Sequence, residues 1–292
     1  MKSSVSAPSR RISLLLKVSR PGLWLVFVWL YLWPTAGNTA LLRTSVFWMG
    51  LLYSTLPLNL LVYGMNDLVD EDTDSVNPRK GNFIYGAKTS KIERRELPFW
   101  MFTLNVVPLC IIAGFTGEWM YLAGWFTAAV SINFLYNNKP FQFSRRCPFE
   151  VPTMILGHFL IPLFSCQIND LSFPGLGSWI FNGFLLARSH IWLEFADIDC
   201  DAKAGKRTFA VRFGPIVAFR TVIALTLLES LSAWLLLESS LLALFSLFGV
   251  LVFWMSATNR GVKEEKVHVS VSQSLVGGAL MVYLWIARVL LK

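Results

Sequence analysis

Residues 44–74 read TSVFWMGLLYSTLPLNLLVYGMNDLVDEDTD, an apolar run that ends abruptly in a cluster of acids. The apolar part covers residues 44–65, which matches the roughly 20 residues that an α-helix needs to cross the hydrocarbon core of a bilayer. Acidic side chains at the edge of such a run are costly to place near lipid, and they usually serve a function. The stretch therefore predicts a membrane helix whose end carries a functional site.

Apolar runs of similar length recur along the whole chain, separated by polar links. Together with the run above they lie at 21–37, 44–65, 97–115, 119–137, 150–168, 174–196, 215–236, 239–257 and 271–291. We therefore expect an all-α, polytopic membrane protein with about nine transmembrane helices around a central cavity. We expect residues 1–292 to form a single membrane domain, in which residues 1–20 are a basic N-terminal tail.

The composition argues against a soluble protein. Hydrophobic residues make up 54% of the chain and charged residues only 15%, whereas a soluble domain carries roughly 25% charged residues. The apolar content also excludes a disordered chain. The four cysteines, Cys110, Cys147, Cys166 and Cys200, show no spacing that indicates a zinc site or a redox pair. An integral membrane protein is the class that remains.

The basic residues gather on one side of the predicted membrane. The net charge is +8, and Lys and Arg cluster before the first run and in the links at 79–95, 139–146, 203–212 and 260–266. Because short cytoplasmic loops are enriched in Lys and Arg, this pattern places the N-terminus and these links on the cytoplasmic, or equivalent, side. It also accounts for the net charge without a nucleic-acid partner. Residues 1–20 are rich in Ser and Arg and lack acids, which is also typical of a transit peptide.

The first acid cluster follows directly on the apolar run at 44–65. Asp67, Asp70 and Asp74 are spaced i, i+3 and i+7, so on a continued helix they share one face, with Asn66 at its edge. Three like charges on one face repel each other, and a hard cation would remove that repulsion. Mg²⁺ commonly binds a few carboxylates together with the phosphate oxygens of a substrate. The spacing therefore indicates a magnesium site.

A second acid cluster ends the run at 174–196. Asp197 and Asp201 are spaced i, i+4, and they share a helix face with His190 and Glu194, which lie deeper in the run. Both clusters fall on the side that carries the basic links, so together they suit a magnesium diphosphate. Two other interpretations stay open, namely solvated helix ends and the cation pathway of a transporter. A pathway would favour acids in the middle of helices.

These motifs resemble the two signatures of the UbiA superfamily of intramembrane prenyltransferases. Asn66-Asp67-x-x-Asp70-x-x-x-Asp74 is similar to the first signature, and Asp197-x-x-x-Asp201-x-x-x-Gly205-x-x-Thr208 is similar to the second. The N-terminal Ser19-Arg20-Pro21 and the segment Tyr136-Asn137-Asn138-Lys139-Pro140-Phe141 with Arg145-Arg146 also fit the family pattern.

The first motif also points to a branch of the family. The stretch at 56–67, together with Asn77-Pro78-Arg79-Lys80-Gly81, is similar to the lycopene-elongase-like branch, whose members prenylate a carotenoid end. Aromatic-acceptor members more often follow the first motif with a segment that contains an Arg-Pro pair, and that pair is missing here.

The resemblance implies a Mg²⁺-dependent enzyme that ionises a prenyl diphosphate and transfers the prenyl group to a lipophilic acceptor, carotenoid-like or aromatic. It implies catalytic and metal-binding roles for five acids, Asp67, Asp70, Asp74, Asp197 and Asp201. The residues expected to bind substrate are Asn66, Arg79, Lys80, Tyr136, Lys139, His190, Glu194, Lys203 and Lys206. Glu194 or His190 would also receive the proton that the acceptor loses.

Two other functions fit the same residues. A terpene cyclase would begin with the same ionisation, and a membrane transporter would use the acids without releasing diphosphate. The sequence leaves open the acceptor, the chain length of the donor, the membrane that holds the protein and its oligomeric state.

Overall fold

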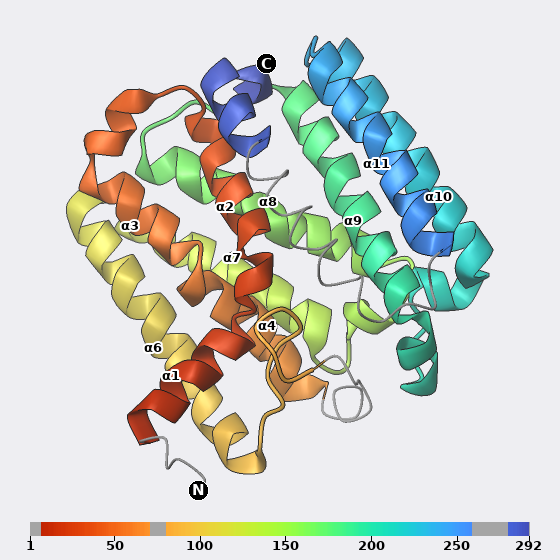
Figure 1. Ribbon diagram of the computed structural model, residues 1–292. Coiled ribbons are helices and arrows are strands. Elements are labelled where there is room, and N and C mark those ends of the chain that lie inside the picture. The colour runs from red at the N-terminus through yellow and green to blue at the C-terminus, as the bar shows by residue number, and fades with distance from the viewer. Residues whose placement is uncertain (1–6, 71–79, 259–279, 292) are drawn as a thin grey trace, which may run out of the picture. The chain divides into compact units, whose positions relative to one another are not determined.

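The computed structural model describes residues 7–70, 80–258 and 280–291, and its regular elements are helices (Figure 1). The long helices are α1 (Ala7–Val18), α2 (Trp24–Leu32), α3 (Ser45–Tyr53), α4 (Leu56–Val69), α6 (Lys91–Thr116), α7 (Trp119–Asn137), α8 (Glu150–Ile168), α9 (Leu176–Lys203), α10 (Phe209–Leu235) and α11 (Ser240–Thr258). Within these described ranges there are isolated bridges but no strands. The all-α prediction is confirmed.

Five segments of the described chain are long and apolar enough to cross a membrane. They are Arg10–Thr35, Ser45–Val69, Lys91–Thr116, Glu150–Ile168 and Phe209–Leu235. The apolar runs predicted at 119–137, 174–196 and 239–257 also form helices, namely α7, α9 and α11. The described residues therefore establish a polytopic helical fold without reaching the predicted number of nine crossings, and part of the last predicted run lies outside them.

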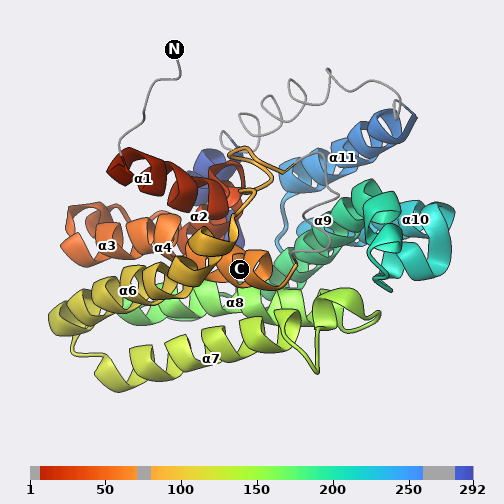
Figure 2. The ribbon, with the colours of Figure 1, turned by 90° about the horizontal axis from the view of Figure 1, so that it is seen from below.

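The chain divides into two compact units, which we treat separately. The first unit comprises Met1–Tyr31, Thr39–Ser144 and Leu156–Leu171, and the second comprises Leu32–Asn38, Arg145–Ile155 and Ser172–Lys292. In the first unit, α4 packs against α1, α3, α6 and α7. Helix α6 lies beside α3 in Figure 1 and beside α7 in Figure 2.

The apolar run before the first acid cluster forms two helices, where the sequence predicts one. Helix α3 ends before Ser54, and α4 begins after Thr55 with Pro57 in its first turn. Buried amides donate to backbone carbonyls around this break. The Asn59 amide donates to the Ser54 and Thr55 carbonyls at 3.0 and 2.7 Å, and the Asn105 amide of α6 donates to Pro57 O at 2.9 Å. A break inside an apolar run is tolerated because the protein, and not lipid, completes these hydrogen bonds.

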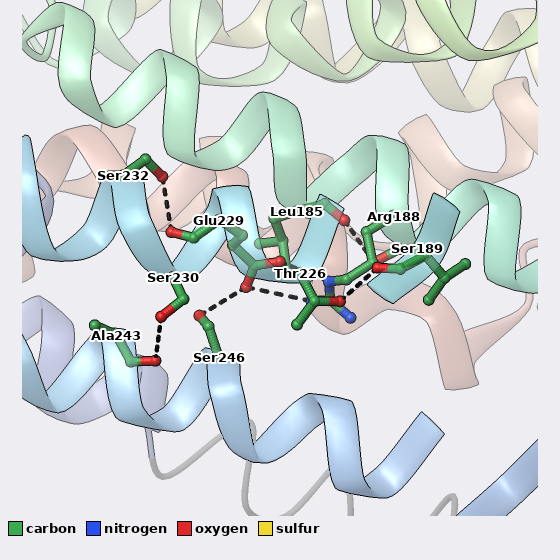
Figure 3. A network of polar contacts seen from close by, with 10 residues as sticks. Leu185, Arg188, Ser189, Thr226, Glu229, Ser230, Ser232, Ala243 and Ser246 are labelled. Carbon is green, nitrogen blue, oxygen red and sulfur yellow. Dashed lines mark hydrogen bonds and ion pairs between the residues drawn. The ribbon is translucent and has the colours of Figure 1, made fainter. Parts of the chain in front are cut away.

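In the second unit, α9, α10 and α11 run side by side, and a buried ion pair joins them (Figures 1 and 3). Arg188 on α9 donates to the Glu229 carboxylate on α10, and Ser246 on α11 donates to Glu229 Oε1 at 2.9 Å. The Arg188 guanidinium also lies 5.1 Å from the centre of the Phe253 ring of α11. The network therefore pairs the charges of Arg188 and Glu229, which are both located within apolar helices.

Helix α10 begins earlier than its apolar run predicts. The run starts at Pro215, but the helix starts at Phe209 and kinks at Gly214. Gly214 has φ 82° and ψ 167°, a backbone conformation that residues with a Cβ rarely adopt. The turn at 209–213 therefore precedes the kink, and the long body of α10 follows it.

Candidate active site

The first acid motif lies at the end of α4, in the first unit. The Asp67 side chain is fully buried, and both a lysine and an arginine reach its Oδ1 atom. Lys80 Nζ donates to Asp67 Oδ1 at 2.6 Å, and the Arg20 guanidinium donates to the same oxygen at 3.0 Å. A buried carboxylate is stable only when it is paired and hydrogen-bonded, and these two contacts meet that need.

Arg20 is a site residue that the sequence analysis did not select. It lies between α1 and α2 with φ 51° and ψ 68°, a left-handed conformation that is strained for a residue with a side chain. Its guanidinium lies 4.5 Å from the centre of the Tyr63 ring on α4. The only signal in the sequence was its place in the N-terminal Ser-Arg-Pro segment, where it also counted toward the basic tail.

A tight turn brings Lys80 to this position. Within the turn, Gly81 N donates to Gly86 O at 2.7 Å, and Gly86 N donates to Asn82 O at 3.2 Å. Gly86 has φ 95°, and a Cβ atom at this residue would lie 3.0 Å from Arg20 Nε and 3.3 Å from Lys80 Nζ. Glycine is therefore required both by the backbone and by the close approach of the two cations.

Helix α4, which carries the motif, ends before Asp70, whereas the i, i+3 and i+7 spacing placed the three acids on a continued helix. Helix α4 ends at Val69, and Asp70 is its C-cap with φ −91° and ψ 32°, its N–H donating to Asn66 O. Asp70 is buried beside the helix end, and Asn66 is half-buried on the last turn. Two predicted site residues, Asp74 and Arg79, lie outside the described residues.

Tyr136 and Lys139 also belong to the first unit. Tyr136 is half-buried near the end of α7, and Lys139 is exposed just beyond that helix. The lysine belongs to the link between α7 and α8, where the sequence placed a basic segment.

The second acid motif lies on the last turns of α9, in the second unit. Asp201 is buried, Asp197 is half-buried, and Asp199 is exposed, as expected for its opposite position on the helix. Lys206 Nζ lies 3.1 Å from Asp201 Oδ1, and the Lys206 backbone N–H donates to Asp201 O at 3.0 Å. The structure therefore pairs the predicted Asp201 with the predicted Lys206.

Lys203 is the exception among the predicted residues of this segment. It is the last residue of α9, and it is exposed. The turn that follows reverses the chain at Gly205, which has φ 69°, and so returns Lys206 to the helix end.

Deeper in α9, the predicted pair of His190 and Glu194 meets a third group, Glu150 at the start of α8. His190 Nε2 lies 3.2 Å from Glu194 Oε1. Glu194 Oε2 accepts from Ala210 N at 3.3 Å, and Glu150 Oε1 accepts from Phe209 N at 2.9 Å. Both carboxylates therefore hold the first turn of α10, where the N-cap Thr208 makes no side-chain hydrogen bond of its own.

The acids present fit a hard divalent cation by their chemistry. Asp67 Oδ2 is buried and receives no hydrogen bond from the described residues, as expected of an oxygen kept for a cation. Mg²⁺ needs few protein ligands, since substrate oxygens and water complete its coordination. No group of three or more His, Cys, Asp or Glu side chains that could hold a metal occurs among the described residues. A magnesium site therefore requires the substrate, or residues such as Asp74, to complete it.

These features define an integral membrane protein of helices that carries acids and cations at two helix ends. The family follows from comparison with known proteins. The chain belongs to the UbiA prenyltransferase family, whose model matches residues 21–286. It is therefore a prenyltransferase, and the resemblance stated from its motifs is confirmed.

Relatives and solved structures agree with this assignment. A protein of Corynebacterium glutamicum named lycopene elongase/hydratase is 30% identical over 228 residues, which cover 75% of this chain and 76% of that protein. A protein of the same name from Halobacterium salinarum is 27% identical over 169 residues, 56% of each chain. Structures of a UbiA homologue from Archaeoglobus fulgidus, bound to GPP and Mg²⁺ or to DMAPP and Mg²⁺, match with TM-scores of 0.70 and 0.67. They are 19% and 18% identical, and each match covers 95% of this chain and 99% of that chain.

Proposed function

We propose that this chain uses Mg²⁺ to transfer the prenyl group of a prenyl diphosphate to a lipophilic, carotenoid-like acceptor. The observation that carries the proposal is the cluster at the end of α4, where the buried Asp67 holds Arg20 and Lys80 together. Two cations fixed side by side at the end of a membrane helix suit a dianionic group better than a single charge.

The cations have complementary roles toward a diphosphate. The Arg20 guanidinium presents a planar set of donors. Its Nε atom is buried and donates no hydrogen bond to the described residues. Such a fork suits two phosphate oxygens at once, whereas Lys80 acts as a point charge. Lys206, which is held at Asp201, is the corresponding donor of the second motif.

The acids would hold the metal that these cations accompany. Asp67, Asp70 and Asp74 of the first motif, with Asp197 and Asp201 of the second, are the proposed ligands. Bound Mg²⁺ would neutralise the charge that develops on the leaving diphosphate. Arg20 and Lys80 donate to the same developing charge, so the C–O bond can break with its electron pair left on the diphosphate.

Two kinds of observation support the donor and the acceptor. The names of the relatives from Corynebacterium and Halobacterium point to a carotenoid acceptor. The Archaeoglobus homologue binds prenyl diphosphates with Mg²⁺. The family match over residues 21–286 includes the residues of both acid motifs.

The test is product analysis with the purified protein in lipid vesicles. Dimethylallyl diphosphate and a series of longer prenyl diphosphates are supplied with Mg²⁺, and with lycopene, 4-hydroxybenzoate or no acceptor. We expect prenylated lycopene and an equal amount of diphosphate, both lost when EDTA removes the metal. The same measurement on Asp67→Asn should show neither product.

Other products would overturn the proposal in distinct ways. A cyclic hydrocarbon formed without acceptor would assign a terpene cyclase, and prenylated 4-hydroxybenzoate alone would assign an aromatic acceptor. Absence of diphosphate release with every donor would remove the proposed reaction itself.

A further inference from the structure

The proposed transfer ends with the loss of a proton. When an acceptor alkene attacks the prenyl cation, the alkylated acceptor is itself a cation, and it regains a double bond by losing a proton from a neighbouring carbon. A water-excluding chamber in a membrane needs a side chain to take that proton. The described residues contain a cluster with the required chemistry in the second unit, formed by His190, Glu194 and Glu150.

The two carboxylates of the cluster are fixed by adjacent backbone groups. Phe209 N donates to Glu150 Oε1 and Ala210 N donates to Glu194 Oε2, so consecutive N–H groups bring the two carboxylates alongside each other. Glu150 is fully buried, and Glu194 is 6% exposed. Neither side chain can move away without losing its contact with α10.

The other oxygen of each carboxylate, Glu194 Oε1 and Glu150 Oε2, is buried and receives no hydrogen bond from the described residues. Glu194 Oε1 nevertheless lies 3.2 Å from His190 Nε2, within ion-pair distance. Glu150 interacts electrostatically with both Glu194 and His190. Cys147 and Arg212 are further ionisable groups beside the cluster, and the Arg212 guanidinium donates to Cys147 O at 3.2 Å.

Two carboxylates at one buried place require a compensating charge. An unpaired buried anion is costly, and a second anion beside it raises that cost. A positive charge for this pair is available on the imidazole of His190 once it takes up a proton, since its Nε2 atom lies 3.2 Å from Glu194 Oε1. The cluster is therefore built to stabilise an added proton.

His190 lies on the same face of α9 as the second acid motif. The helix is continuous from Leu176 to Lys203, so His190 stands seven residues before Asp197 and eleven before Asp201, close to a whole number of turns in both cases. Along the axis it lies about 10 Å deeper than Asp197. A prenyl chain whose diphosphate binds at the acid motif would begin near that depth. His190 is also the most exposed of the three side chains of the cluster, at 16%.

We propose that His190 takes the proton of the alkylated acceptor and that Glu194 and Glu150 stabilise the imidazolium that results, an inference that rests on the function proposed above. The acceptor C–H bond breaks, its electron pair forms the new C=C bond, and the proton forms an N–H bond on His190. Glu194 lies against the ring that gains the charge. Glu150 acts through Glu194, so it is a positioning residue. The proton passes to water after turnover.

The test compares His190→Gln and Glu150→Gln with wild type, using dimethylallyl diphosphate, Mg²⁺ and lycopene in vesicles. Gln at residue 150 keeps an oxygen for Phe209 N–H and loses only the charge. Ser189→Ala is the matched control on α9, since Ser189 Oγ bonds only Leu185 O among the contacts found for it. Prenylated lycopene, prenyl alcohol and diphosphate are measured separately.

We expect His190→Gln to lower prenylated lycopene by at least about 10-fold. Diphosphate release should stay within about twofold of wild type, with water capturing the cation as prenyl alcohol. Glu150→Gln should lower the yield less, and it should shift the acidic limb of the pH profile of product formation. Ser189→Ala should match wild type in all three products.

Two results would overturn the inference. Wild-type yield of prenylated lycopene in His190→Gln would exclude His190 as the acceptor of the proton. A wild-type pH profile in Glu150→Gln would reduce Glu150 to a helix cap. Failure of the proposed function is a separate outcome, because wild-type protein would then release no diphosphate.

Discussion

Lys80 and Arg20 reach the same oxygen of Asp67, so each is half of the charge compensation of a buried carboxylate. We predict that Lys80→Met raises the KM for dimethylallyl diphosphate by about 10-fold or more, because a charged hydrogen-bond donor is lost at the proposed phosphate site. Steady-state kinetics measures the change.

Lys88→Met is the control for this substitution, since Lys88 is exposed in the same turn region. An unchanged KM in Lys80→Met would contradict a role of this lysine in binding the donor.

The turn that delivers Lys80 gives a second prediction. Gly86→Ala would place a Cβ atom 3.0 Å from Arg20 Nε, whereas the nearest atom to a Cβ at Gly81 is 3.9 Å away. Both glycines have positive φ, so both substitutions carry backbone strain of about 1–3 kcal/mol. We expect Gly86→Ala to reduce kcat/KM at least about 10-fold beyond Gly81→Ala, because only the first moves the two cations. Equal losses of kcat/KM in Gly86→Ala and Gly81→Ala would show that backbone strain alone explains both effects, and would contradict a displacement of the two cations.

Cys147 offers a chemical probe of the carboxylate pair. Burial raises the pKa of the Cys147 thiol, and the negative charges of Glu150 and Glu194 raise that pKa further, while Arg212 lowers it. The thiolate fraction at a given pH is therefore smaller than for an exposed peptide thiol, and alkylation is slower.

Removing one negative neighbour favours the thiolate, so Glu150→Gln should lower the pKa of Cys147. The rate of iodoacetamide labelling, measured by mass spectrometry of the Cys147 peptide across pH, should rise at lower pH in this variant. An identical pH profile would show that Glu150 carries no charge beside the thiol.

Single residues also show where sequence reasoning stops. The spacing of acids predicted Asp67, Asp197 and Asp201, and it found His190 and Glu194 on one helix face. It did not select Glu150, whose position at the start of an apolar run is typical of an ordinary helix end. Its role depends on a contact with a residue 59 positions away, which no local pattern encodes.

At the scale of helices, the buried network of α9, α10 and α11 predicts a large loss of stability. Glu229→Ala leaves the Arg188 charge without its carboxylate, and breaking one partner of a buried pair costs about 3–5 kcal/mol. Ser246→Ala removes one hydrogen bond to the same carboxylate and should cost only about 1 kcal/mol.

Unfolding in detergent, followed by circular dichroism, gives both values. The double variant Arg188→Met with Glu229→Ala should recover part of the loss, because no buried charge then lacks a partner. If the double variant lost as much stability as Arg188→Met and Glu229→Ala lose when their separate losses are added, a direct pairing of the two residues would be contradicted.

Helices were predicted more reliably than their ends. Hydropathy located α7, α8, α9 and α11 to within a few residues at their starts, because lipid-facing and core-facing residues are both apolar. It missed the break between α3 and α4, where buried amides donate to the backbone carbonyls around the break. It also missed the first turn of α10, where Arg212 and Gly214 interrupt the apolar residues before Pro215.

At the scale of the whole molecule, the basic links predict which side of the membrane each loop faces. Single-cysteine variants in a background without the native cysteines test this, with Lys88→Cys and Arg207→Cys on the basic side and Ser172→Cys on the other. All three residues are exposed. A membrane-impermeant maleimide should label the first two from the cytoplasmic face and the third only from the opposite face. Labelling of all three from one face would overturn the proposed sidedness.

The class of the molecule was accessible from the sequence because two acid motifs and a low charge content are properties of the chain itself. The pairing of charges within the site could not be predicted from the sequence. Asp67 and Asp201 are each joined to a lysine further along the chain, and the choice of lysine depends on a turn. Lys139 and Lys203 were also expected to bind substrate, and both are exposed.

The kink at Gly214 separates two parts of α10 that make different contacts. On one side, the turn at 209–213 is gripped by Glu150 and Glu194. On the other, the long body of α10 is tied to its neighbours through Glu229. A helix in a bilayer tilts when the thickness of the lipid changes. Because Arg188 ties the body of α10 to α9, which also carries Glu194 and Asp201, such a tilt would move the two helices together, while the bend at Gly214 lets the held turn at 209–213 keep its own direction.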